Sequence, residues 1–499
     1  MPKIRINEVD NTGIASLPST PNVVYIPGAA TTAIAPKLFT NARAFEKAFD
    51  ENHNYVHDDS AKLAHHLLTL GLHVLYEGIV LAGGDPSEVE EVEYSVPMTK
   101  TKLEGDLSIL SFSIDGIEYT VDTERTEVTW VFDGNEESSE IITSGLISTV
   151  EVQGGLVVTL DEVGLKAVYT KEYNLSGTPV VDWKKLEDKA MYDVRFLTTG
   201  AYRCPNEDMV KCAAKRVDAI ALIDCQEDED SALECRAWFD NFLSSMINVE
   251  TGEYTQEILA YTKGSTVDPL AFAAGFTPYW SGNINGIDGW TTLEKIPASF
   301  GYLIAFARSV QNNPIWYAAA GSFRGLIPEL ISVGVEYSTA DIEVLQARAK
   351  DQEVALDDAG DNVGIAINPI ALVKPFGHIV WGNRTLRFNA ESNNVGVTKA
   401  TSFLNCRVLG TEVAKQLYNA ARKYTFEQNS VVLWTNFRAE VTPTLDRMES
   451  GNGILGYTFK KVATDKKARL AAKVALIPIE GIEDFDMDIE MTDNISISA

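Results

Sequence analysis

Two secondary-structure patterns follow one another along this 499-residue chain, and their order constrains its fold. Before about residue 90 and after about residue 178, amphipathic helical stretches alternate with short apolar strands. Between these limits lie short strands of alternating polarity, joined by turns such as Asp115-Gly116 and Gly154-Gly155. Alternating helices and strands are typical of an α/β layer with a mostly parallel sheet. We therefore predict an all-β domain that is inserted into an α/β domain and faces outward.

The α/β pattern on both flanks can be assigned to individual elements. Asn41 is a candidate N-cap, and Gly71 is placed to end a helix that begins at Ser60. The predicted helices cover residues 42–49, 61–70, 210–217, 233–246 and 298–311, and the predicted strands cover 23–26, 73–80, 219–224, 257–261 and 271–276.

The last third of the chain mixes helices and strands in a different order. Two short apolar strands enclose a Gly-Asn turn within residues 364–386, and a long amphipathic helix is predicted over 405–424. A shorter helix is predicted over 342–350, and further strands are predicted over 431–434, 457–462 and 474–479. This order indicates a C-terminal α+β domain.

Charge and end sequences exclude several classes of partner. The formal net charge is -29 at pH 7, which argues against nucleic acid because binding to phosphates requires clustered Lys and Arg. The first residues lack the apolar core of a signal peptide, and no apolar run is long enough to span a bilayer. We therefore expect synthesis in a cytosol and no direct membrane insertion. The five cysteines are expected to be reduced thiols.

Clusters of possible metal ligands have unfavourable spacing. Four cysteines fall within residues 204–235, but they lie further apart than the ligand pairs of structural zinc sites, which favours buried or incidental thiols. Five of the six histidines fall within residues 53–73. His65 and His66 are adjacent and therefore cannot form an i, i+4 clamp on one helix face. We expect ordinary surface and interface histidines, and no metal site.

Motifs for cofactor binding and catalysis are also weak. Residues 451–456 match the G-x-G-x-x-G string of dinucleotide sites, but a predicted strand follows where a helix is required. A hairpin loop is the favoured interpretation. The acidic run at 227–230 lacks the glycine of a calcium loop and is interpreted as a solvated face. No nucleophile, base and orienting group can be assembled from the sequence, so neither a cofactor nor an enzyme activity is predicted.

Both ends of the chain contain a short alternating strand. Residues 3–9 and 484–491 each place apolar side chains on one side and polar side chains on the other. An unpaired strand exposes backbone donors and acceptors that can pair with another chain. The two ends are therefore candidates for strand exchange between subunits. The alternative, that both strands fold back into the sheets of their own chain, stays open at this level.

Several segments resemble the contractile tail sheath proteins of bacteriophages. The most specific are Asn368-Pro369 and the Val-Trp-Gly-Asn-Arg-Thr-Leu run at 380–386. The other segments similar to the family lie at 182–186, 194–200, 403–409, 426–429, 451–456 and 477–479, with the acidic-apolar ending. Leu70-Gly71-Leu72 departs from the usual Gly-Gly at the end of the first-layer helix.

This resemblance implies a structural subunit that polymerises as stacked hexameric rings around an inner tube. In that family, N- and C-terminal arms complete a small sheet in neighbouring subunits, and contraction drives the tube through a cell envelope. The implied partners are other copies of the chain, the tube protein, and baseplate and tail terminator proteins. The implied location is the tail of a virion assembled in the host cytoplasm. A sheath from a bacterial injection device and a cytosolic nucleotide- or metabolite-binding α/β enzyme are the alternatives.

The resemblance and the patterns together give a predicted division of the chain. It comprises an N-terminal arm (1–20), an α/β domain (21–90 with 179–338), the inserted domain (91–178), a conserved C-terminal domain (339–480) and a C-terminal arm (481–499).

Three groups of site residues are predicted from this division. The predicted intersubunit arm residues are Ile4, Ile6, Val9, Phe485, Met487, Ile489 and Met491. The predicted core residues of the C-terminal domain are Pro369, Phe376, Trp381 and Arg384, and the possible tube contacts are Lys415, Arg422 and Lys423.

Overall fold

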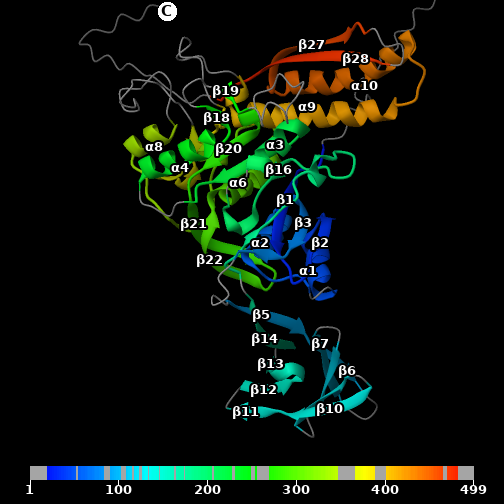
Figure 1. The fold of residues 1–499 in the computed structure, drawn as a ribbon, viewed down its shortest axis with the longest axis vertical. Helices are drawn as coiled ribbons and strands as arrows, with labels where there is room; N and C mark the ends of the chain where they lie inside the picture. Colours follow the sequence, from blue (N-terminus) through cyan, green and yellow to red (C-terminus); the bar gives the residue numbers. More distant parts are fainter. Residues whose placement is uncertain are drawn as a thin grey trace, which may run out of the picture.

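The chain folds into a mixed α/β structure with several sheets (Figure 1). This computed structural model describes residues 20–51, 54–83, 90–102, 108–114, 117–122, 126–132, 134–144, 147–161, 165–173, 175–204, 207–226, 231–248, 253–255, 269–346, 366–387, 400–464 and 469–481. An α/β body occupies the middle of the molecule, a β-rich unit lies at one end, and a helical hairpin with a two-stranded sheet lies at the other.

The body is built on a seven-stranded sheet. Its order is β2 (Ile34–Phe39), β3 (His73–Ile79), β1 (Val23–Ala29), β16 (Phe196–Leu197), β17 (Ile220–Asp224), β20 (Ala273–Phe276) and β24 (Ile367–Asn368). All neighbouring pairs are parallel except β2 with β3. Strand β1 is buried along its whole length, as expected for a central strand covered on both faces.

Helices cover both faces of this sheet. One face packs against α1 (Ala42–Glu51), α2 (Asp59–Thr69) and α6 (Ala298–Asn312). The other face packs against α3 (Glu207–Arg216), α4 (Ala232–Ser244) and α8 (Thr339–Gln346). Asn41 accepts a hydrogen bond from the backbone N–H of Ala44 at the start of α1, whereas Asp58, not Ser60, caps α2. The predicted strand at 257–261 lies outside the described residues.

Smaller elements complete the body. A three-stranded sheet contains β21 (Tyr279–Gly286), β22 (Gly289–Pro297) and β23 (Leu330–Val333). The remaining short elements are β18 (Ile247–Asn248), β19 (Glu253–Tyr254), β25 (Ile370–Val373), β26 (Gly377–Val380), α7 (Gly321–Arg324), and the 3-10 turns η3 (Lys185–Glu187), η4 (Gly200–Tyr202), η5 (Pro269–Phe272) and η6 (Ala400–Ser402).

The β-rich unit leaves and re-enters the body through one pair of strands. Strand β4 (Leu81–Ala82) pairs antiparallel with β15 (Thr178–Pro179), so the entry and exit points lie side by side. One antiparallel sheet has the order β10 (Asn135–Glu140), β9 (Glu127–Phe132), β8 (Ile117–Asp122), β7 (Ser108–Ile114), β6 (Thr99–Lys102). The other has the order β11 (Ile142–Ser144), β12 (Ile147–Val152), β13 (Leu156–Asp161), β14 (Lys166–Tyr173), β5 (Glu90–Pro97), with η2 (Gln153–Gly155) before β13. Side chains such as Phe112, Trp130 and Tyr169 form their common core.

The unit at the opposite end is a helical hairpin covered by a β-hairpin. Helices α9 (Leu404–Lys423) and α10 (Val431–Ser450) pack against β27 (Ile454–Val462) and β28 (Ala471–Pro478), with Phe437 and Phe459 in the shared core. The predicted helix over 405–424 corresponds to α9, and the predicted strands over 457–462 and 474–479 correspond to β27 and β28.

Two expectations for this unit were wrong. Residues 431–434 form the first turn of α10 instead of a strand, because the Ser430 hydroxyl caps the helix by accepting from the N–H of Leu433. Residues 451–453 of the glycine-rich segment join α10 to β27, and residues 454–456 belong to β27, so this segment does not close a hairpin. The predicted C-terminal domain over 339–480 also contains β24, which belongs to the body sheet.

Candidate functional site

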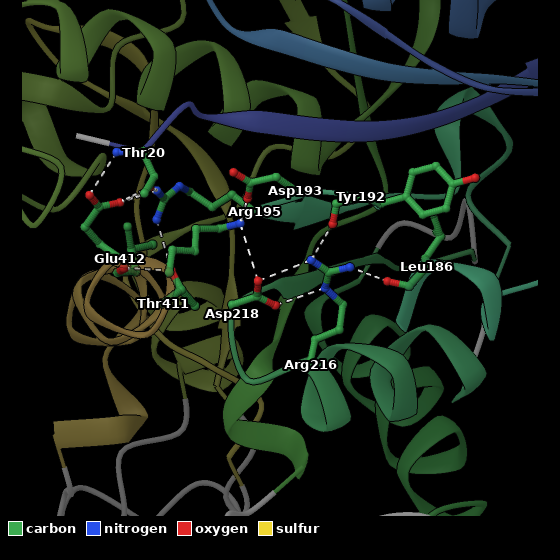
Figure 2. A network of polar contacts seen from close by, with 11 residues as sticks. Thr20, Leu186, Tyr192, Asp193, Arg195, Arg216, Asp218, Thr411 and Glu412 are labelled. Carbon is green, nitrogen blue, oxygen red and sulfur yellow. Dashed lines mark hydrogen bonds and ion pairs between the residues drawn. The ribbon is translucent and has the colours of Figure 1, made fainter. Parts of the chain in front are cut away.

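Helix α9 crosses the amino-terminal ends of two central strands of the body sheet. Arg195 directly precedes β16, and Asp218 lies two residues before β17. On α9, Leu404 and Val408 join the apolar core of the body. The same helix face then continues with Thr411, Glu412 and Lys415, which are all buried. The second half of this docking surface is therefore polar (Figure 2).

The first polar cluster, here called the Thr20 clamp, consists of Thr20, Arg195, Thr411, Glu412 and Gln416. The backbone N–H of Thr20 donates to Glu412 Oε1 over 3.1 Å, and its hydroxyl donates to Glu412 Oε2. Arg195 Nη2 donates to the Thr20 hydroxyl over 2.6 Å and also pairs with Glu412. Arg195 Nη1 donates to the Thr411 hydroxyl over 3.2 Å, and Gln416 donates to Glu412 Oε1. The clamp joins residues almost 400 positions apart in the sequence.

The charge on Arg195 favours the ionised form of the buried Glu412 carboxyl. The Arg195 and Glu412 side chains are 0% and 2% exposed. Burial alone would raise the pKa of the Glu412 carboxyl, but the Arg195 charge and hydrogen bonds from Thr20 and Gln416 outweigh it and lower that pKa. A buried pair of this kind is costly to break from one side, because one charge then remains without compensation.

A second buried cluster lies one turn further along α9. Lys415 pairs with Asp193 and lies 3.6 Å from Asp218 Oδ2. Asp218 is in turn held by Arg216, which also donates to the backbone carbonyls of Leu186 and Tyr192. Burial lowers the pKa of Lys415, and the carboxylates of Asp218 and Asp193 oppose that shift.

The first turn of α9 holds the other end of the described chain. Asn405 Nδ2 donates to the backbone carbonyl of Ile479, just after β28, over 3.4 Å. It also donates to Trp316 O over 3.2 Å, while its side-chain oxygen accepts from Asn383 Nδ2 over 2.7 Å. Asn383 Oδ1 in turn accepts a hydrogen bond from the backbone N–H of Asn405. Helix α9 therefore contacts the chain close to the points where both terminal segments leave the described structure.

The Asn368-Pro369 and Gly382-Asn383-Arg384 segments are hydrogen-bonded to each other close to Asn405. The amide of Asn368 donates to Arg384 O over 2.9 Å and accepts from Arg384 N over 2.8 Å. A side chain on Gly382 would collide with Asn368, since a Cβ atom there would lie 2.6 Å from Asn368 Oδ1. These segments thus fix the loop from which Asn383 reaches α9.

Comparisons with known proteins find similarity among solved structures. No family model matches the chain, and no curated protein matches it. A sheath protein of the extracellular contractile injection system PVC, in its contracted state, is 14% identical, with 98% of each chain covered and a TM-score of 0.49. A sheath tail protein from Listeria innocua is 10% identical, covering 93% of this chain and 96% of that one, with a TM-score of 0.40. A chain of the anti-feeding prophage baseplate is 14% identical over 60% of this chain and 69% of that one, with a TM-score of 0.38.

The four residues predicted to form a C-terminal core lie in different environments. Pro369 is buried. Phe376 is 54% exposed in the turn between β25 and β26, and Trp381 is 37% exposed, so both placements in a core were wrong for the single subunit. The guanidinium of Arg384 lies over the ring of Phe403, 4.4 Å from its centroid.

The three residues predicted as possible tube contacts also lie in different environments. The prediction that Lys415 contacts the tube was wrong. Its side chain is buried against Asp193 and Asp218 and cannot reach a partner. Arg422 and Lys423 are exposed near the end of α9, where Lys423 pairs with Glu440 of α10. All seven predicted arm residues, Ile4, Ile6, Val9, Phe485, Met487, Ile489 and Met491, lie outside the described residues.

The histidines and cysteines are mostly structural in the described region. His57, His65 and His66 are buried, so the expectation of surface histidines was wrong for these three. His65 contacts Glu46, and His66 contacts Glu329 and the backbone N–H of Asn285. All five cysteines are free thiols. Within the described ranges, no group of three His, Cys, Asp or Glu side chains could hold a metal ion. In the same ranges, none of the helices has the length and apolarity to cross a membrane.

The sequence prediction missed the Thr20 clamp and its neighbour. One signal was available: Glu412 and Lys415 continue, at helical spacing, the stripe that Leu404 and Val408 begin. Charged residues on the buried stripe of an amphipathic helix indicate a charged partner surface. The identity of that partner, Arg195, depends on the tertiary structure.

Proposed function

We propose that this chain is the subunit of a contractile sheath that polymerises as stacked hexameric rings around an inner tube, and that it has no enzyme activity. On this proposal, contraction of the polymer drives the tube through a cell envelope. The sequence resemblance over the Asn-Pro and Trp-Gly-Asn-Arg segments supports a tail sheath. A sheath of a bacterial injection device would work in the same way. In both cases the same rigid bodies switch between two discrete packings.

The observation that carries this proposal is the isolated β27–β28 sheet. It contains two strands, and neither has a second strand partner among the described residues. One face packs on α10 through Phe459, while side chains such as Lys460, Val462 and Lys473 are exposed. A two-stranded sheet is marginal on its own and gains stability from additional strands. Strands supplied by neighbouring copies would complete it, as in other cases of strand addition between chains.

Charge on this sheet suits an acidic strand. Lys460 and Lys473 lie directly opposite each other across the two strands, and both are exposed. Like charges in this position repel and destabilise the pair. The ending at 482–491 contains five acidic residues and no basic residue. On the proposal, this ending from a neighbouring copy adds to the sheet and neutralises the two lysines.

The distribution of charge along the chain supports assembly between unlike surfaces. Residues 404–481 contain 12 Lys and Arg against 7 Asp and Glu, whereas residues 90–173 contain 5 against 18. A basic unit on a subunit of net charge -29 favours head-to-tail contacts over contacts between identical surfaces. Arg422 and Lys423 remain the proposed contacts to the inner tube.

Negative-stain microscopy of the purified full-length chain tests the proposal directly. A sheath subunit is expected to form long tubes, whereas a cytosolic enzyme would give discrete particles. Deletion of residues 484–499 is expected to leave a folded subunit that no longer polymerises. Tubes formed by the truncated chain would contradict the proposed role of that ending.

A tube contact is tested by co-sedimentation with the tube protein. Changing Arg422 and Lys423 to Glu is expected to weaken assembly around the tube, and the difference from wild type should shrink at high salt. Polymerisation of the same variant without the tube protein is the control, because it distinguishes a lost tube contact from a lost contact between subunits. If the Arg422 and Lys423 variant assembles around the tube as well as wild type at both salt concentrations, these residues do not contact it.

A further inference from the structure

Thr20 has an environment unlike that of the residues that follow it. It is 7% exposed, although Pro21 is exposed and β1 begins only at Val23. Its burial is therefore not a continuation of the central strand. Both its backbone N–H and its hydroxyl donate to the Glu412 carboxylate on α9. The chain is thus held at a separate anchor before it enters the sheet (Figure 2).

Arg195 closes this anchor from the opposite side. The Thr20 hydroxyl accepts from Arg195 Nη2 while it donates to Glu412, so it bridges the two charges. If Thr20 moves away, the buried carboxylate loses two of its donors. If α9 moves away, Thr20 loses its acceptor. The position of Thr20 and the docking of α9 therefore depend on each other, and this dependence is reciprocal.

The same helix anchors the far end of the chain. Asn405, seven residues before Glu412, donates to the carbonyl of Ile479. Seven residues of helix correspond to about 10 Å along its axis. Thr20 is thus held at Glu412, and Ile479 is held two turns earlier on the same helix.

We propose that α9 is a common anchor for both terminal segments, and that Arg195 and Glu412 act as positioning residues which hold Thr20 at the base of the N-terminal segment. This inference rests on the proposed sheath function, in which residues 1–19 pair with a neighbouring copy. A segment of 19 residues spans at most about 65 Å when fully extended. Fixing its base limits the volume it can reach and raises its effective concentration at one site on a neighbour.

The second cluster on α9 supplies a matched control. Lys415 is as buried as Glu412 and lies one turn away on the same helix. It pairs with Asp193 and Asp218, at the ends of the same two strands. A change at Lys415 therefore disturbs α9 docking to a similar extent without removing an acceptor from Thr20.

The experiment compares four full-length variants with wild type: Thr20→Val, Thr20→Ser, Lys415→Met and the double change Arg195→Met with Glu412→Leu. Hydrogen exchange of peptides that contain the Thr20 amide is measured on unassembled subunits. We expect exchange at least tenfold faster in the double variant, and wild-type exchange in Thr20→Ser and Lys415→Met. Thr20→Val keeps its backbone donor and should give an intermediate result.

Assembly kinetics supply the second readout. We expect the double variant and Thr20→Val to assemble at least tenfold more slowly than wild type, with Thr20→Ser restoring the wild-type rate. Unchanged Thr20 protection in the double variant would overturn the inference, and so would equal slowing by Lys415→Met. If wild type itself forms no tubes, the sheath proposal fails, whereas the exchange measurement still decides whether the clamp exists.

Discussion

Helices α6 and α9 both pack against the central sheet, but they do so with opposite chemistry. Helix α6 is buried almost all round by apolar side chains, including Phe300, Leu303 and Phe306. Helix α9 ends its contact with the body through Glu412 and Lys415, each opposite a charge. Apolar packing supplies most of the free energy of folding but accepts small displacements. Buried ion pairs contribute less net stability, but their geometry can favour one position of the elements that they join. Our hypothesis is that they do so for α9.

The difference is visible where each helix approaches its neighbours. Gly301 lets α6 approach very closely, because a Cβ atom there would lie 2.8 Å from side-chain atoms of both Ile327 and Ile370. On α9 the contact distances are set by hydrogen bonds instead. We infer that α6 belongs to the permanent core, while α9 forms an interface with a defined register.

The largest expected effect comes from breaking the α9 interface on one side. Glu412→Leu leaves Arg195 buried without a counter-charge, and we expect it to lower the free energy of unfolding by about 3–5 kcal/mol. Adding Arg195→Met should recover most of that loss, since neither charge then remains. Chemical denaturation of the unassembled subunits measures both values. An equal loss of unfolding free energy in the single and double variants would show that the uncompensated charge on Arg195 is not the cause of the destabilisation.

The two helices should also respond to pH in opposite directions. Asp224 accepts hydrogen bonds from the backbone N–H and hydroxyl of Ser299 at the start of α6, and burial raises its pKa to about 7. Because the unfolded carboxyl ionises near pH 4, this group destabilises the fold progressively as pH rises from about 4 to about 7. Glu412 has a lowered pKa, so its contribution is present above its unfolded pKa and is lost as pH falls through its folded pKa.

Asp224→Asn should remove the α6 part of this pH dependence. Relative to wild type, the variant should gain stability on the order of 3 kcal/mol between about pH 4 and pH 7. The slope of unfolding free energy against pH is the measurement, because it is independent of any fixed cost of the substitution. If the curves of unfolding free energy against pH are parallel for the variant and the wild type, Asp224 is not the source of this pH dependence.

A volume-conserving change tests the tolerance of the apolar helix. Leu303→Met on α6 should cost less than about 1.5 kcal/mol, because Met can adapt its shape to the same space. The comparably conservative Glu412→Gln on α9 removes a buried charge and should cost more. The comparison is wrong if the order of the two losses, measured by thermal or chemical unfolding, is reversed.

The smallest expected effect lies at the tip of the α9–α10 hairpin. Phe426 has a φ angle of 74° and is fully exposed, so its strained backbone is not offset by burial of its ring. Phe426→Gly should raise the stability of the unassembled subunit by about 1 kcal/mol. A loss of stability instead would indicate that the ring has an intramolecular contact.

Local pattern predicted the elements that agree with their tertiary surroundings. The helical period over α9 and the alternation over β7, β8, β9 and β13 were identified because burial follows the period of the element. Helix α10 was missed for a physical reason. Its first residues, Val431 and Val432, have strand propensity but are exposed, and Pro443 interrupts its middle. Packing of Phe437 and Leu445 in the hairpin core outweighs these local preferences.

The sequence by itself determined the fold class, the insertion of a β-rich unit, the acidic character of the chain and the basic stretch near its C-terminal end. These follow from periodicity and charge, which are properties of neighbouring residues. Only the tertiary structure decided that Glu412 meets Arg195 and Thr20, and that Lys415 is buried instead of exposed. Such contacts join residues about 200 to 400 positions apart. Chain topology sets them, and a local pattern contains no information about which distant charge compensates a buried one.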